Sequence, residues 1–334
     1  MNINSSKILF SLMIIMSSLI TLSSSNWLGM WMGLEMNLMS FIPFISKNKN
    51  KKSSKAMMIY FLTQSIGSIV LLFSIMMDSL LFMLPNDINE LTKILLMISI
   101  MIKTGAAPFH LWLPEMMANL NWLECAVLMT WQKIAPLTIM NNILPNNWFL
   151  YMVALLSAAT GGIGGLNQTS LRKILAYSSI NHLSWMMIFM SMNNSWYKYL
   201  VIYSVLITMV CIMLYMKNTY FINQMVSSSY SMAEKFTCIT LFLSIGGLPP
   251  FLGFLPKWMV IQSMINSELY LLMVLMLLFS LITLFYYMRI MTSYILFYST
   301  MNKFVFKYKS NMMLTYSFFS INLLMPAFLM MSFI

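Results

Sequence analysis

The sequence predicts an all-α, polytopic membrane protein with eleven transmembrane helices. Of the 334 residues, 60% are hydrophobic and only 8% are charged, and the mean hydropathy is +0.79. A soluble globular protein has about 25% charged residues. The apolar residues gather into segments near the length of about 20 residues that a helix needs to cross a bilayer. The connections between them are short, so we expect one membrane domain and no soluble domain.

The predicted spans follow one another from the first residues of the chain. The apolar run Ile8–Leu22 lacks the small-residue cleavage site of a signal peptide, and a further spanning pattern begins at Trp27. We therefore expect the N-terminus to be mature. The longest polar connections are 47–55, 218–234 and 299–310. The predicted spans are 7–23, 26–46, 55–77, 88–106, 121–143, 147–167, 170–192, 195–217, 235–265 (interrupted), 268–298 and 311–333.

The distribution of basic residues predicts the orientation. Lys and Arg in short loops favour the inner side of a membrane. With the N-terminus inside, the outer loops hold Lys198, Asp78, Asp87, Glu90 and Glu268. The net charge of +11 then reflects topology, so we expect no nucleic-acid binding. The inner face receives Lys7, Lys47, Lys49, Lys51, Lys52, Lys55, Arg172, Lys173, Lys217, Lys235, Arg289, Lys303, Lys307 and Lys309.

Two segments break the helical pattern in a similar way. Lys103–Glu115 and Gly246–Lys257 each read Gly, then Pro-Phe, then Leu-Pro and a charged residue. Paired interruptions of this kind point to an inverted repeat with a site near mid-membrane. The two breaks lie five spans apart. Because five is odd, the second copy of such a repeat would cross the membrane in the opposite direction to the first. We predict repeats over 1–143 and 144–298 and a terminal helix in 299–334; the alternative is two unrelated kinks.

Four charged residues lie inside these apolar segments: Glu35, Lys103, Lys133 and Lys257. A charge at mid-membrane costs roughly 2.5–3.5 kcal/mol, so such residues are functional candidates for ion or proton pathways. Glu35 is roughly 13 Å of helix from either end of its span, so it must be protonated or paired. Lys103 is its expected partner, and Lys133 precedes Pro136 in mid-span. The alternatives are a structural ion pair for Glu35 and a Lys257 that reaches the interface.

Three further titratable residues have weaker patterns. His182 follows serine and asparagine in mid-span, so we interpret it as a proton relay, with a hydrogen-bonded core residue as the alternative. Glu115 follows Pro114 in a segment too short to span, which favours a first-turn partner of the helix dipole over a catalytic acid. Glu124 lies nine residues before Lys133, on the opposite helix face, and we interpret it as structural or interfacial.

The sequence contains no pattern for a bound cofactor or metal. Its three cysteines are scattered among apolar residues, and its two histidines are too few to hold two bis-histidine haems. It has no glycine-rich dinucleotide fingerprint and no Walker motif. The 40 methionines fit an AT-rich genome that reads ATA as Met, as in animal mitochondria, better than a set of metal sites. We expect no cofactor and no metal in this chain.

Four strings resemble the antiporter-like membrane subunits of respiratory complex I, and among them the subunit 2 family of mitochondrial NADH dehydrogenase. They are Lys103–Glu115 (KTGAAPFHLWLPE), Trp131–Pro136 (WQKIAP), Arg172–His182 (RKILAYSSINH) and Gly246–Trp258 (GGLPPFLGFLPKW). The resemblance extends from about Trp27 to Tyr287 and, with the methionine excess, is closest to insect or other invertebrate forms.

The resemblance implies a buried chain of charges. In this family a glutamate pairs with a lysine in the first half, and a lysine on the following helix connects this pair to a lysine on the broken helix of the second half. By motif these are Glu35, Lys103, Lys133 and Lys257, with His182 on the connecting route. Bacterial relatives have fourteen helices, and this chain resembles the animal members that lack the first three.

The function implied by the resemblance is proton translocation in the membrane arm of NADH:ubiquinone oxidoreductase. NADH, FMN, iron–sulfur clusters and ubiquinone are then expected in other subunits. The expected partners are neighbouring antiporter-like subunits and membrane lipids, including cardiolipin. The expected location is the mitochondrial inner membrane, with the N-terminus in the matrix and the C-terminus in the intermembrane space. The alternatives are a free-standing cation/proton antiporter and a structural assembly subunit.

Overall fold

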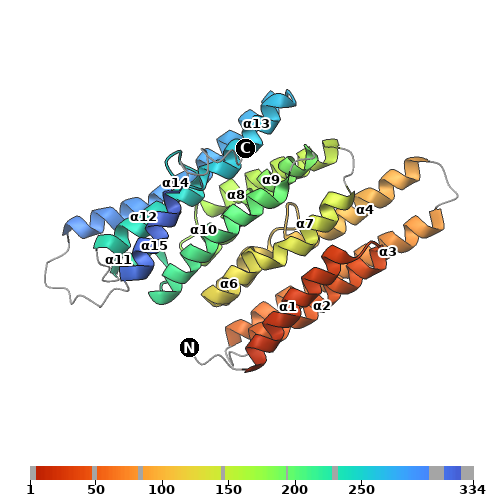
Figure 1. The fold of residues 1–334 in the computed structure, drawn as a ribbon, viewed down its shortest axis with the longest axis horizontal. Helices are drawn as coiled ribbons and strands as arrows, with labels where there is room; N and C mark the ends of the chain where they lie inside the picture. Colours follow the sequence, from red (N-terminus) through yellow and green to blue (C-terminus); the bar gives the residue numbers. More distant parts are fainter. Residues whose placement is uncertain are drawn as a thin grey trace. The chain divides into compact units, whose positions relative to one another are not determined.

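The computed structural model describes residues 5–46, 51–81, 86–143, 147–192, 195–227, 232–300 and 312–324. Every regular element in these ranges is an α-helix (Figure 1). The only strand-like pairing within them is an isolated bridge between Ser170 and Phe221. The prediction of an all-α chain is confirmed.

The first of two compact units comprises Met1–Val153. In it α3 packs against α2, α4 and α5, while α7 packs against α1, α2, α4 and α6. Lys133 of α7 is therefore surrounded by the helices that carry Glu35 and Lys103. The helices are α1 (Ser5–Ser23), α2 (Trp27–Ser46), α3 (Lys51–Leu81), α4 (Asn86–Thr104), α5 (Trp112–Asn119), α6 (Trp122–Met129) and α7 (Trp131–Ile143).

The second unit comprises Ala154–Ile334 and has α9 near its centre. Every residue from Ser178 to Ser191 is buried, as in a helix enclosed on all sides by protein. The end of α8 (Asn147–Gly165) also belongs to this unit. Its other helices are α9 (Leu171–Ser191), α10 (Trp196–Met216), α11 (Ile222–Ser227), α12 (Met232–Gly246), α13 (Phe254–Asn266), α14 (Tyr270–Thr300) and α15 (Met312–Asn322).

Within the described ranges, six helices are long and apolar enough to cross a membrane: α1, α2, α3, α8, α10 and α14. The prediction of one continuous helix over 121–143 is wrong, because it divides at Thr130 into α6 and α7. The interruption predicted within 235–265 is confirmed. Of the predicted terminal span, only 312–324 is described. Some predicted inner-face lysines lie outside the described residues: Lys47, Lys49, Lys303, Lys307 and Lys309.

The two predicted breaks begin with the same backbone geometry. α4 ends at Thr104 and is followed by Gly105 with φ +73°, while α12 ends at Gly246 and is followed by Gly247 with φ +82°. Glycine adopts this left-handed conformation without the steric cost that a Cβ brings. It is the usual residue just past a helix C-terminus.

The hydrogen bonds after each glycine also correspond. Ala106 donates its N–H to the carbonyl of Met101 (3.1 Å), and Leu248 donates to Leu243 (3.3 Å). These bonds cap the last turns of α4 and α12. Both helix ends and both restarts, 104 with 246 and 112 with 254, are 142 residues apart. One local fold therefore occurs twice in the chain.

Candidate functional site

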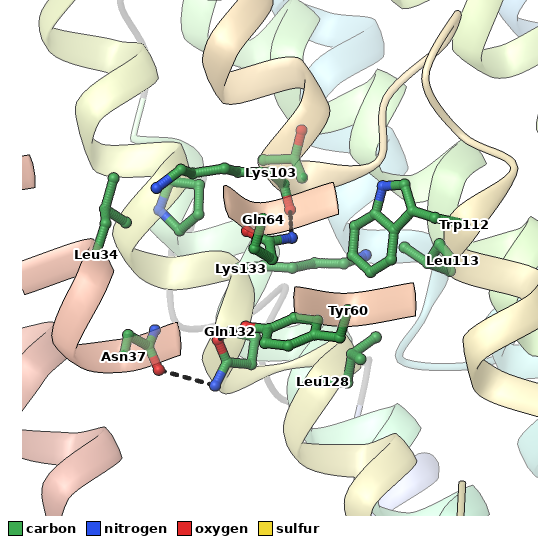
Figure 2. A pocket seen from close by; sticks show the side chains of 12 residues that line it. Leu34, Asn37, Tyr60, Gln64, Lys103, Trp112, Leu113, Leu128, Gln132 and Lys133 are labelled. Carbon is green, nitrogen blue, oxygen red and sulfur yellow. Dashed lines mark hydrogen bonds between the residues drawn. The ribbon is translucent and has the colours of Figure 1, made fainter. Parts of the chain in front are cut away.

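A small polar cavity lies in the first unit, at the crossing of α2, α3, α4 and α7 (Figure 2). Its volume is about 20 Å³, which is room for about one water molecule. Two of the predicted buried charges, Lys103 and Lys133, border the same cavity. The lining residues are Leu34, Asn37, Tyr60, Gln64, Lys103, Thr104, Trp112, Leu113, Leu128, Gln132, Lys133 and Pro136.

A side-chain hydrogen-bond network forms the polar wall of this cavity. Gln132 Nε2 donates to Asn37 Oδ1 (2.9 Å), and the Tyr60 hydroxyl donates to Gln132 Oε1 (3.3 Å). Gln64 Nε2 donates to the backbone carbonyl of Lys103 (3.1 Å). A membrane interior offers polar groups no bulk water. The network therefore fixes the groups that face the two lysines.

Lys103 lies in the last turn of α4 and is only 6% exposed. α3 and α4 lie close together at this point: a Cβ added to Gly67 of α3 would lie only 3.0 Å from Lys103 Cγ. In Figure 2 the Lys103 side chain extends toward Leu34 of α2, whereas Lys133 extends the other way, toward Trp112. The two ammonium groups of this cavity are thus directed toward different helices.

Glu35 is half-buried in the middle of α2. Its Oε2 atom is buried and accepts no hydrogen bond from the described residues. The carboxyl group interacts electrostatically with Lys103 and with Tyr60. It forms no salt bridge with Lys103, since the one salt bridge within the described ranges joins Lys217 to Glu234. The direct Glu35–Lys103 pair expected from the sequence is therefore absent from this conformation.

Lys133 is 3% exposed and lies three residues after the break between α6 and α7. At this break Thr130 Oγ1 donates to the carbonyl of Ala126 (2.7 Å), and the N–H of Lys133 donates to Thr130 (3.3 Å), a tighter i−3 pattern. Pro136 has no N–H to donate to the carbonyl of Gln132. Lys133 therefore lies beside the cavity, in a segment whose backbone hydrogen bonds depart from the regular α-helical pattern.

His182 lies in α9 of the second unit and is 7% exposed. Its Nδ1 is hydrogen-bonded to the Tyr199 hydroxyl (2.9 Å), and its ring centroid is 4.8 Å from that of Tyr203. Both tyrosines belong to α10. The histidine is therefore a hydrogen-bonded core residue whose partners are themselves able to exchange protons.

Lys257 lies in the first turn of α13 and is 6% exposed. Its Nζ donates to the carbonyl of Gly246 at the end of α12 (2.7 Å). The Lys257 ammonium group is therefore buried and held at the helix break. The negative end of the α12 dipole also stabilises the positive charge there.

The two weaker acidic candidates have structural surroundings. Glu115 is exposed in the first turn of α5, where a carboxylate interacts favourably with the helix dipole. Glu124 is buried and accepts hydrogen bonds from Asn121, which together form a capping box at the start of α6. No group of three potential metal-binding His, Cys, Asp or Glu residues occurs in the described parts of the chain.

Comparisons with known proteins identify the family. The family model described as "NADH:quinone oxidoreductase/Mrp antiporter, TM" matches residues 24–283. NADH-ubiquinone oxidoreductase chain 2 of Locusta migratoria is 46% identical over 310 residues, covering 92% of this chain and 91% of the relative. The chain belongs to this family. Chain 2 of Anopheles gambiae is 44% identical over 291 residues, covering 84% of both chains.

A solved structure of respiratory complex I from Thermus thermophilus shares the fold of this family member. It matches with a TM-score of 0.80 at 17% identity, covering 97% of this chain and 78% of the other. The predicted family resemblance is confirmed. The roles of Glu35, Lys103, Lys133, His182 and Lys257 stay predictions, because the comparisons concern the whole chain and not these residues.

Sequence reasoning missed the amides and tyrosines around these charges. Asn37, Gln64 and Gln132 lie inside predicted spans, and an amide in lipid must find a partner. That requirement is a usable signal of an internal polar network. Tyr60 carried less signal, since tyrosine is also common at membrane interfaces.

Proposed function

We propose that this chain translocates protons in the membrane arm of NADH:ubiquinone oxidoreductase, through Glu35, Lys103, Lys133, His182 and Lys257. NADH, FMN, iron–sulfur clusters and ubiquinone belong to other subunits of the complex. The observation that carries the proposal is the burial of Lys103, Lys133 and Lys257, each 3–6% exposed inside an apolar helical protein. Ionisable groups at such depth mark ion or proton paths.

In this mechanism Glu35 controls the proton on Lys103. A carboxylate that moves toward Lys103 stabilises the ammonium form, and a carboxylate that moves away allows the proton to leave. The conformation described here has the two groups in electrostatic contact without a salt bridge.

The released proton passes to Lys133 through the cavity that both lysines border. The cavity has room for about one water molecule beside Gln132 and Tyr60, and in this mechanism the lysine side chains must turn toward that water to exchange the proton. From Lys133 the proton continues to His182 and Lys257 in the second unit. Moving one charge across the membrane costs about 2.3 kcal/mol per 100 mV, which the redox reaction of the other subunits must supply.

We also propose the inverted-repeat architecture, with eleven spans in two five-helix repeats and a terminal helix. It is supported by the constant separation of 142 residues between corresponding ends of the two helix breaks. The proposed setting is the mitochondrial inner membrane, with the N-terminus in the matrix and the C-terminus in the intermembrane space. Neighbouring antiporter-like subunits and lipids, including cardiolipin, are the proposed partners.

The experiment compares Glu35→Gln and Lys103→Met with Lys93→Met in the complete complex reconstituted into vesicles. Lys93 is an exposed lysine on the same helix, α4, and is the matched control. We expect both site variants to lower the ratio of protons translocated to electrons transferred, and the control to leave it unchanged. An unchanged ratio in both site variants rejects these roles. Cation exchange by the isolated chain would support the antiporter alternative instead.

A further inference from the structure

A group of buried hydroxyls lies on α9, which carries His182, and on two helices packed against it, and it has no part in the mechanism above. α9 contributes Ser178 and Ser179, α10 contributes Tyr203, and α14 contributes Tyr286 and Tyr287. Each of these side chains is at most 2% exposed. Burying a hydroxyl in an apolar environment is unfavourable unless it is hydrogen-bonded, and phenylalanine would fill the same space without that cost. Five such groups in one place therefore call for a chemical reason.

The hydroxyls nearest to His182 come from α9 and α10. The Tyr203 ring packs on the imidazole at 4.8 Å between centroids, and its hydroxyl interacts with Ser179. Ser178 precedes His182 by four residues, so both side chains lie on the same face of α9, one turn apart. Both serines donate their own protons to backbone carbonyls, Ser178 to Leu175 and Ser179 to Ala176. Each serine oxygen can still accept a hydrogen bond from a tyrosine hydroxyl.

The group continues from Ser178 to α14. Ser178 interacts with the hydroxyls of both Tyr286 and Tyr287, whose rings are 4.8 Å apart. Tyr286 also lies against the last residue of α8, because a Cβ added to Gly165 would be only 2.7 Å from its ring. These hydroxyl-bearing side chains therefore lie near one another, from one turn before His182 to the end of α8.

These side chains extend toward the turn between α8 and α9, where backbone carbonyl groups are exposed to hydrogen-bond donors. In the turn between α8 and α9, Arg289 of α14 donates to the carbonyls of Leu166 and Gln168 (2.6 Å for the second). His182 is eleven residues from the start of α9, about 16 Å along the helix. The hydroxyls thus bridge the depth between a buried histidine and a polar turn that the proposed topology places on the matrix side.

We propose that Ser178, Ser179, Tyr203, Tyr286 and Tyr287 form a relay that exchanges protons between His182 and the α8–α9 turn. The proposal rests on the proposed function, in which His182 carries protons. Each hydroxyl oxygen accepts a proton from the turn side and releases its own proton to the next group, so every hydroxyl ends neutral. The net result is one proton gained by a ring nitrogen of His182, and rotation of the hydroxyls restores the series.

The test is the double variant Tyr286→Phe/Tyr287→Phe in the complete complex, reconstituted into vesicles. Tyr270→Phe is the matched control, since Tyr270 belongs to the same helix and is 55% exposed. A positioned proton-transfer group accelerates its step by about 10²–10⁴-fold, so its loss should make this route slow relative to turnover. We expect the double variant to lower the ratio of protons to electrons, while electron transfer in uncoupled vesicles stays within about twofold of wild type.

Two comparison variants separate the possible results. If Lys103→Met lowers the ratio and the tyrosine double variant does not, the relay is wrong while the proposed function stands. If Lys103→Met leaves the ratio unchanged, the proposed function itself fails. If the double variant does not assemble, the proton-to-electron ratio is measured in Ser178→Ala instead, because alanine removes only the Oγ atom in the middle of the proposed relay. A normal ratio in Ser178→Ala would then overturn the relay.

Discussion

Replacing Lys257 with Met should lower the ratio of protons translocated to electrons transferred while changing stability little. Methionine has a similar length and no charge. The variant loses the hydrogen bond from Nζ to the carbonyl of Gly246, made at 2.7 Å by a charged donor, which is worth about 1.5–3 kcal/mol. It also removes a buried ammonium group whose desolvation costs several kcal/mol. Because these terms oppose each other, the free energy of unfolding should change by less than about 2 kcal/mol.

Lys257→Arg separates the charge from the mobile proton. Arginine keeps the positive charge and the donors that cap α12, but it cannot lose its proton in a protein. We expect the arginine variant to assemble normally and also to lower the ratio of protons translocated to electrons transferred. The assay measures NADH-driven acidification of vesicles together with electron transfer, and a melting curve of the purified complex measures stability.

Two results would refute this reasoning. Normal translocation by Lys257→Arg would show that Lys257 acts as a fixed charge and not as a proton carrier. A loss of stability well above about 3 kcal/mol in Lys257→Met, with normal translocation in the arginine variant, would make the lysine a structural cap of α12.

Two further predictions concern the helix breaks and the cavity wall. Gly253→Ala places a Cβ in a steric clash with the carbonyl oxygen of Ser244, so the second break must open. Native gels should then show less assembled complex, and a normal yield would contradict this. Gln132→Leu leaves polar atoms of Asn37 and Tyr60 unpaired in a buried place, at about 1–3 kcal/mol each, so the melting temperature should fall. An unchanged melting temperature would mean that the network adds no stability.

Much of the fold could be predicted because its signals are local. Apolar runs fixed the positions of the long helices such as α1, α2 and α10 to within a few residues. Gly105 and Gly247 were recognisable because glycine followed by proline removes regular backbone bonding. These features depend on the identity of a residue and its neighbours, and not on distant packing.

The division of 121–143 was missed because its cause is tertiary. The run from Trp122 to Ile143 is apolar and near spanning length, and Pro136 alone permits a continuous kinked helix. The interruption falls six residues earlier, at Thr130, where α6 and α7 pack in the first unit. Sequence spacing does not contain that information.

The charged residues of the candidate site could be selected from the sequence, but the side chains around them could not. Charged residues in lipid are rare enough to be noticed singly, so Glu35, Lys103, Lys133 and Lys257 were all selected. That Nζ of Lys257 returns to the end of the preceding helix depends on the path of the loop between α12 and α13. The cavity between Lys103 and Lys133 likewise depends on how separate helices cross.

The most direct test of the account is the proton-to-electron ratio of the complex that carries Lys133→Met. Lys133 borders the cavity with Lys103 and is the last buried charge of the first unit, so every proposed path through this chain uses it. Both quantities are measured in the same vesicles, so a change in turnover cannot imitate a change in coupling. The account predicts a lower ratio with electron transfer retained. A ratio equal to that of the wild-type complex would contradict it.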